Sequence, residues 1–233
     1  MSVIIIKTDK NMEGSIYQIL QTSPLFEGFS AREIEEMLSS TEYRIVEYPA
    51  KEIYTLAGLP CRYADFILSG ELISRMTGLS GKQVQIDRLK ACMLIAPAFI
   101  FAENNAMPVS VETAKPTTIL RMKPSELKRL IDENEHLRMN FIRRLSSIDV
   151  FLTQKLRMLS LFTVREKVAY FLIKAAKEQQ SRIIKLDKSR QELADMFGIQ
   201  KFSLLRCLSE FEANGAIKID GKMITILNSD KMK

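Results

Sequence analysis

The sequence predicts an α+β fold in three parts: a barrel of short strands, a long helix, and a C-terminal group of short helices ending in a β-hairpin. Between residues 42 and 122 the apolar segments are short, rich in Val, Ile, Tyr and Thr, and separated by Gly and Pro, which is typical of strands. From residue 136 to about residue 160 the apolar residues recur at helical spacing. Beyond residue 189 two short helical patterns flank a glycine, and alternating apolar residues follow them.

Charge is distributed unevenly along the chain. The 233 residues are 46% hydrophobic, enough for one large domain or two ordinary ones. The net charge is +6, and the stretch from residue 161 to the end holds +5 of it, with fourteen Lys and Arg against nine acids. This C-terminal excess predicts a polyanionic partner for that part of the chain.

Several functional classes are not expected. Cys61, Cys92 and Cys207 are widely spaced, which argues against a metal cluster or a disulfide framework and favours reduced thiols in the cytoplasm. No apolar run approaches about 18–20 residues, so no membrane span is predicted, and Val3–Ile6 is too short for a signal peptide. With one histidine, no Gly-rich phosphate loop and no clustered carboxylates, the sequence does not predict an enzyme.

The N-terminal third supplies the first helices and then the strands. Residues 1–14 are expected to be irregular and residues 16–22 to form a short helix. Ser30 and Glu33 make a capping box for a helix that ends near residue 39. Eight strands are then predicted at Tyr43–Tyr48, Glu52–Thr55, Asp65–Ser69, Glu71–Thr77, Lys82–Leu89, Cys92–Ala96, Val109–Ala114 and Thr117–Met122. Their number and spacing predict a closed barrel or jelly roll, and a further helix starts at Pro124.

The long helix carries an apolar repeat of 4-4-3-4-4-3. This is a heptad pattern, and it predicts the seam of a homodimer, with one edge of the helix also touching the barrel. The alternative is a core helix packed only on its own domain. The predicted seam consists of Leu137, Phe141, Leu145, Ile148, Leu152, Leu156 and Leu159.

Residues 189–211 predict a helix-turn-helix. Ser189 and Glu192 form a capping box, and Gly198 ends the first helix. The second helix starts near Gln200, and its expected inner stripe is Leu204, Leu205, Leu208 and Phe211. Asp220-Gly221 is expected to turn a hairpin within residues 215–227, so the arrangement is a winged helix. The alternative is an ordinary helical hairpin whose charges are merely solvated.

Four stretches together resemble the Crp/Fnr family of bacterial transcription regulators: Pro24–Phe26, DFILSG at Asp65–Gly70, Val164–Ala169, and SRQELADMFGI at Ser189–Ile199. The resemblance implies a double-stranded β-helix, the cyclic-nucleotide-binding-like jelly roll, as an effector domain over residues 1–132. It further implies a dimerisation helix over 133–160 and a winged helix-turn-helix over 161–233. Such a homodimer binds a double-stranded DNA operator of two-fold symmetry, with RNA polymerase as a further candidate partner.

The resemblance also implies which residues contact DNA. Phosphate contacts are expected from Ser189, Arg190, Gln191 and Lys222, and the first turns of the recognition helix supply Gln200, Lys201, Phe202, Ser203 and Arg206. The family commonly reads bases with an Arg-Glu pair and a later Arg. Lys201 and Arg206 match the basic positions, but Phe202 stands where the acid would be, which implies a different half-site.

The effector is not expected to be cyclic AMP. Members that bind it carry Gly-Glu and Arg-Ser pairs in the barrel, whereas residues 96–101 here read APAFIF, and no arginine lies between Arg88 and Arg121. The region is apolar, and it predicts either core packing or a hydrophobic effector pocket. The pocket residues would be Ile95, Phe99, Ile100, Phe101, Met107 and Val109, facing Met139, Phe141 and Ile142 of the long helix.

Haem is the alternative effector. Residues 96–111 resemble the HcpR-like nitrosative-stress branch of the family, which implies a haem-based sensor of nitric oxide with DNA binding as its output. His136 is the one candidate histidine ligand, with Cys61, Cys92 and several methionines as other donors. The alternative for His136 is a residue that simply starts the long helix. No metal site is otherwise predicted.

Overall fold

The computed structural model describes residues 4–6, 10–78 and 83–232, and it confirms the α+β fold. The chain divides into two compact units, and the division falls inside the long helix between Val150 and Phe151. One unit contains the chain up to Met76 together with Ile86–Val150. The other contains Thr77–Gln85 together with Phe151 to the C-terminus.

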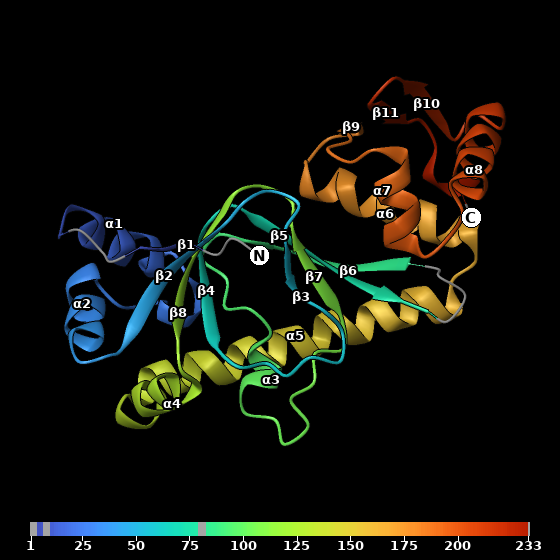
Figure 1. Ribbon diagram of the computed structural model, residues 1–233. Coiled ribbons are helices and arrows are strands. Elements are labelled where there is room, and N and C mark those ends of the chain that lie inside the picture. Colours follow the sequence, from blue (N-terminus) through green and yellow to red (C-terminus); the bar gives the residue numbers. More distant parts are fainter. Residues whose placement is uncertain (1–3, 7–9, 79–82, 233) are drawn as a thin grey trace. The chain divides into compact units, whose positions relative to one another are not determined.

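The N-terminal unit is built on two four-stranded antiparallel sheets (Figure 1). One sheet has the order β1-β2-β8-β4 and the other β3-β7-β5-β6. The strands are β1 Ile4–Ile6, β2 Tyr43–Tyr48, β3 Ile53–Thr55, β4 Ala64–Ser69, β5 Glu71–Thr77, β6 Gln83–Lys90, β7 Ser110–Thr113 and β8 Thr117–Met122. This double-sheet arrangement is the predicted jelly roll.

Two predictions for this unit are wrong. The stretch Cys92–Ala96 is not a strand, because Cys92 (φ 72°) and Ala96 (φ 47°) both adopt left-handed backbone that breaks an extended chain. The short helix α3, Pro97–Ile100, follows it. The N-terminal arm is not irregular throughout, since β1 pairs with β2 and helix α1 runs over Lys10–Gln21. The predicted turn at residues 79–81 and the start of β6 at Lys82 lie outside the described residues.

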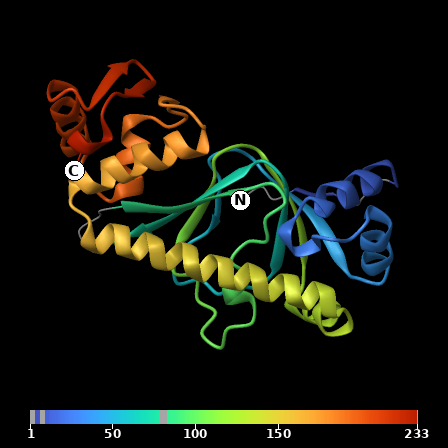
Figure 2. The ribbon, with the colours of Figure 1, turned by 180° about the vertical axis from the view of Figure 1, so that it is seen from behind.

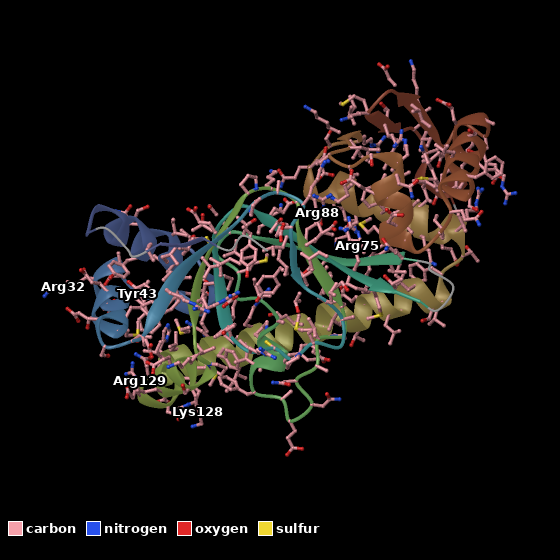
Figure 3. The ribbon with its side chains drawn as sticks, viewed as in Figure 1. Arg32, Tyr43, Arg75, Arg88, Lys128 and Arg129 are labelled. Carbon is pink, nitrogen blue, oxygen red and sulfur yellow. The ribbon has the colours of Figure 1, made fainter. Side chains whose placement is uncertain are left out.

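Helices flank the sheets of this unit. The predicted capping box of Ser30 and Glu33 starts α2 at Ala31–Ser39, and η1 (Pro24–Phe26) and α4 (Pro124–Glu133) complete the set. Arg129 of α4 donates from Nη2 to the backbone oxygen of Ser40 and to Oγ1 of Thr41, both at 3.0 Å, and so ties α4 to the end of α2 (Figure 3). The buried core of this unit includes Leu20, Phe26, Ile34, Ile45, Phe66, Leu72 and Ile95.

The turn between β4 and β5 requires glycine at residue 70. Gly70 has φ +93°, and a Cβ atom there would lie 2.4 Å from the Pro116 carbonyl oxygen. We expect Gly70→Ala to lower the free energy of unfolding by about 3 kcal/mol, since it adds a backbone clash to the left-handed strain. Urea unfolding followed by tyrosine fluorescence measures this loss.

Gly58 provides the matched control for Gly70. It has φ +85°, but nothing lies within 4 Å of a Cβ atom built there. Gly58→Ala is therefore expected to cost only about 1 kcal/mol. Equal losses in the two variants would show that the contact with Pro116 does not matter.

The long helix α5 covers Glu135–Leu161 without interruption, as Figure 1 and Figure 2 show. After it, Thr163 and Glu166 form a capping box that starts α6, Val164–Glu178. None of the helices over residues 4–6, 10–78 and 83–232 combines the length and the hydropathy that a membrane span needs.

The C-terminal unit places two short helices beside a three-stranded sheet. The helices are α7 (Arg190–Phe197) and α8 (Lys201–Ala213), and the sheet order is β10-β11-β9. The strands are β9 Ile183–Lys185, β10 Ile217–Asp220 and β11 Met223–Ile226, and η2 Ser229–Met232 follows. The predicted wing hairpin is present, but Asp220 pairs with Met223, so its two-residue turn is Gly221-Lys222 and not Asp220-Gly221.

Candidate functional site

The helix-turn-helix forms from local signals in the sequence. The Ser189 hydroxyl accepts a hydrogen bond from the Glu192 backbone N–H at 3.2 Å, and the Glu192 carboxylate accepts one from the Ser189 N–H at 2.7 Å. Gly198 ends α7 in the left-handed conformation, with φ 63°. Three residues later α8 begins at Lys201, with Gln200 as its N-cap. The cap and the glycine therefore fix the angle at which α8 leaves the turn.

The inner face of α8 differs from the prediction at one residue. Leu204, Leu208 and Phe211 are buried as expected, but Leu205 is 39% exposed and does not belong to the inner stripe. Cys207 is also buried on this face, although the predicted inner stripe does not include it. Burial raises the pKa of the Cys207 thiol to about 11, so this side chain behaves as a small apolar core residue.

The outer face of α8 offers an aromatic ring and a guanidinium one helical turn apart. Phe202 is 72% exposed, and the Arg206 side chain is 70% exposed. The nearest acid to Arg206 is Glu210, at 3.6 Å, in a solvent-exposed pair that contributes little to stability and can be exchanged for another partner. Gln200 and Lys201 are also exposed, whereas Ser203 is half-buried.

The residues expected to contact phosphates are in three different situations. The Ser189 hydroxyl is engaged in the helix cap. Arg190 donates from Nη2 to the Gly221 carbonyl at 3.2 Å, so it ties α7 to the turn of the wing, and burial lowers its pKa. Gln191 donates to the Asp195 carboxylate at 2.9 Å but remains exposed, and Lys222 is exposed in the wing turn. Lys222 is therefore the best placed of the four for an additional anion.

The predicted seam of α5 mixes residues from two faces of the helix. Leu137 and Phe141 are buried in the core of the N-terminal unit, at 0% and 7% exposure. They contact their own barrel, so the prediction that they face a second copy is wrong. Leu145 is half-buried against the same core, Ile148 is half-buried, and Leu159 packs against the core of the C-terminal unit.

A different set of apolar residues on α5 faces outward. Leu152 and Leu156 of the predicted seam are 44% and 65% exposed. Met139 and Ile142 are 43% and 48% exposed, so the prediction that they close an effector pocket is wrong. These four residues give α5 an exposed apolar surface.

The N-terminal unit contains a cavity of about 270 Å³. Its walls come from Tyr48 of β2, Tyr54 of β3, Arg121 of β8, the segment Leu59–Tyr63, and Ile95, Ala96 and Met107. Of the predicted pocket residues, only Ile95 and Met107 line it. Phe99, Ile100, Phe101 and Val109 lie in the neighbouring segments and do not line it, and Phe101 instead packs edge-on against Phe141 at 5.7 Å between ring centroids.

A buried ion pair lies beside the cavity. Asp65 is fully buried, and its carboxylate accepts hydrogen bonds from Arg121 Nε at 3.0 Å and from Nη2 at 2.5 Å. The Tyr54 hydroxyl donates to the same carboxylate at 2.9 Å, and the Tyr63 ring lies 4.5 Å from the guanidinium carbon. Burial, and then the negative charge of Asp65, raise the pKa of Tyr54 well above its usual value, so its hydroxyl stays protonated.

His136 is not part of the cavity. Its Nε2 atom lies 2.8 Å from the Glu27 carbonyl oxygen, and its ring packs edge-on against Phe29 at 5.0 Å. These contacts fix the start of α5 and do not favour His136 as a haem ligand. Within the part of the chain that the structure describes, no group of three or more His, Cys, Asp or Glu side chains is arranged to hold a metal ion.

The sequence of this chain is similar to those of characterised proteins. Residues 166–233 match the family model of the Crp-like helix-turn-helix domain. The transcriptional activator protein anr of Pseudomonas aeruginosa is 26% identical over 132 residues, which cover 54% of this chain and about half (54%) of that protein. The cAMP-activated global transcriptional regulator CRP of Haemophilus influenzae is 21% identical over 190 residues, covering 80% of this chain and 85% of that one.

A solved structure agrees with the fold over nearly the whole chain. A mutant of CooA from Carboxydothermus hydrogenoformans superposes with a TM-score of 0.70 at 16% identity, covering 98% of this chain and 96% of that one. At this identity the likeness shows the fold.

Proposed function

Since this chain carries a Crp-like helix-turn-helix domain on the Crp/Fnr fold and is of the Crp/Fnr type, we propose that it is a homodimeric regulator of transcription. In this proposal it binds a double-stranded DNA operator of two-fold symmetry, with one α8 helix in each half-site. The observation that carries the proposal is the outer face of α8, where Lys201, Phe202 and Arg206 are exposed on the helix that such domains insert into the major groove.

The chemistry of this face suggests how bases are read. A guanidinium can donate two hydrogen bonds to the O6 and N7 atoms of guanine, and Arg206 has the exposure that this contact requires. Phe202 has no polar atom on its side chain, so its contribution is an apolar contact of the kind that thymine methyl groups provide. The Lys222 ammonium in the wing turn is placed to contact a phosphate, which positions the protein without specifying sequence.

The homodimer rests on the exposed apolar residues of α5. Leu152, Leu156, Met139 and Ile142 would be covered by the same residues of a second copy in a two-fold interface. RNA polymerase remains a further candidate partner of the DNA-bound dimer.

The effector is proposed to bind in the barrel and not to be a cyclic nucleotide. The guanidinium in the cavity, Arg121, is already paired with Asp65, so it offers a hydrogen-bond donor but no net positive charge to a phosphodiester. The alternative of a haem-based sensor is less well supported, since His136 lies away from the cavity and contacts the Glu27 carbonyl.

Removal of Arg206 tests the base-reading role. In Arg206→Ala we expect discrimination against a changed base pair in the half-site to fall about tenfold or more, because a bidentate guanine contact contributes about 1–3 kcal/mol of specificity. DNA selected from a random pool with the unmodified protein, and then single-base variants of it, would serve as ligands in a fluorescence anisotropy assay.

Lys222→Ala is the matched control for Arg206→Ala. Loss of a phosphate contact should weaken binding to every sequence alike and lower the slope of log K against log salt by about one. If Arg206→Ala also weakened all sequences equally, with the base preference unchanged, Arg206 would be a phosphate contact and the assignment to base reading would be wrong.

A further inference from the structure

The hydrogen-bond inventory of the cavity is rich in donors. Arg121 Nη2 donates to the Tyr48 hydroxyl oxygen at 3.0 Å, which leaves the Tyr48 O–H free to donate elsewhere. Arg121 Nη1 has no hydrogen-bond partner among residues 4–6, 10–78 and 83–232. The cavity wall formed by β2 and β8 therefore contains two hydrogen-bond donors without an acceptor among the described residues, the Tyr48 O–H and Arg121 Nη1.

Acceptors are scarce in the same place. Oδ2 of Asp65 receives hydrogen bonds from Tyr54 and from Arg121, and Oδ1 receives one from Arg121. The Tyr54 hydroxyl is held as a protonated donor to that carboxylate. The one carboxylate beside the cavity is therefore already occupied by its own hydrogen bonds, which disfavours a cationic ligand.

The net charge of the cavity also favours an anionic ligand. Asp65 and Arg121 neutralise each other, and the exposed Arg62, which lines the cavity and has no ion-pair partner among the described residues, adds one positive charge. The remaining walls include apolar and aromatic side chains: the ring centroids of Tyr48 and Tyr54 lie 5.8 Å apart, and Ile95 and Met107 also line the cavity. Such a site combines a polar anchor with an apolar body, as small-molecule sites do.

We propose that this cavity binds a small organic anion, a carboxylate on a flat apolar body, with the carboxylate held by Arg121 Nη1, the Tyr48 hydroxyl and Arg62. This inference rests on the proposed function, because it makes that anion the effector of the regulator. Inorganic anions lack the apolar body that the tyrosine rings and Ile95 would contact, and a volume of about 270 Å³ suits a body of one or two rings.

Isothermal titration calorimetry of the full-length protein tests the proposal. Benzoate, cinnamate and naphthoate are titrated beside their neutral amides and inorganic phosphate. At least one of the three carboxylates is expected to bind about tenfold or more tightly than its amide, since charge-assisted hydrogen bonds are roughly twice as strong as neutral ones. Phosphate that bound as tightly as the best carboxylate would overturn the role of the apolar body.

Two variants assign the anchor to particular atoms. Tyr48→Phe removes the O–H donor together with the oxygen that accepts from Arg121 Nη2, and Arg62→Gln removes the positive charge of Arg62. Each is expected to weaken binding of the carboxylate about tenfold, while leaving the Asp65–Arg121 pair intact. Arg32→Gln is the matched control: it also removes one exposed arginine charge, but from α2, where Arg32 pairs with Glu36 (Figure 3).

The outcomes separate this inference from the proposed function. Binding of no carboxylate, or unchanged binding in both Tyr48→Phe and Arg62→Gln, overturns the anion site. DNA binding by the same preparations is measured in parallel. If the protein binds selected DNA but no organic anion, only the anion site is wrong, and if it binds no DNA at all, the proposed function itself fails.

Discussion

Replacement of Asp65 by alanine is expected to lower the free energy of unfolding of the N-terminal unit by about 3–5 kcal/mol. The change leaves the Arg121 guanidinium, which is only 9% exposed, without its counter-charge, and it removes the acceptor of the Tyr54 hydroxyl. A buried charge without a partner is costly because it loses its hydration and the protein interior offers no interaction of comparable strength. Removal of one partner therefore costs more free energy of unfolding than the intact pair contributes to it.

Tyrosine fluorescence during urea unfolding measures this loss. The chain has no tryptophan, and five of its six tyrosines belong to the N-terminal unit. Asp132→Ala is the matched control, since Asp132 forms an exposed ion pair with Lys128 on α4, and its removal should change the midpoint very little.

A double-mutant cycle distinguishes lost pairing from lost packing. In Asp65→Leu with Arg121→Met, neither charge of the pair is left buried, so the double variant is expected to be more stable than Asp65→Leu alone. Strictly additive losses would mean that the two side chains do not depend on each other, contrary to the hydrogen bonds between them.

A charged residue at position 156 is expected to separate the proposed dimer while the protomer stays folded. Leu156 is 65% exposed, so Leu156→Glu disturbs little within one chain, and glutamate is compatible with a helix. In a two-fold interface the change is made twice: two apolar contacts are lost and two carboxylates are buried. We expect the dissociation constant of the dimer to rise about a thousandfold.

Sedimentation velocity gives the oligomeric state, and anisotropy with selected DNA gives the effect on operator binding, which should fall together with dimerisation. Circular dichroism checks that the helix content is kept. Gln154→Glu adds the same charge two residues earlier on another face of α5 and should remain dimeric. A Leu156→Glu protein that stayed dimeric would place the seam elsewhere on the molecule.

The parts of the fold that the sequence predicts well are those fixed by neighbouring residues. The capping boxes of Ser30 and Ser189, and the left-handed Gly198, act within one helical turn, so their positions can be derived without knowledge of the rest of the chain. The strand predicted at Cys92–Ala96 fails for the opposite reason. Two residues other than glycine adopt positive φ there, and nothing in their side chains indicates it.

The faces of α5 could not be assigned from periodicity alone. Leu137 and Phe141 are four residues apart and face the barrel, while Met139 and Ile142 are also close to helical spacing and face outward. A helix with apolar residues on more than one face satisfies a heptad pattern in more than one register. Which face meets the barrel depends on residues more than a hundred positions earlier, such as Phe26.

The ion pair beside the cavity had a signal that the sequence analysis did not use. Asp65 and Arg121 are the single charged residues of the strands β4 and β8, and they are register partners of each other. Opposite charges in two buried strands indicate that the strands pair at those positions. The cavity itself could not be derived, since its walls come from residues 48 to 121 and meet only when the sheets form.

The buried thiol of α8 has a consequence for chemical damage. Cys207 is the one cysteine in the stretch from Phe151 to the C-terminus, it is 4% exposed, and its raised pKa keeps it protonated at neutral pH. Since oxidants and alkylating reagents attack thiolates, this sulfur is shielded both by its surroundings and by its proton. Peroxide therefore has little access to the thiol of the helix-turn-helix, and since Cys61 is also buried with a raised pKa, Cys92 is the more accessible of the other two thiols.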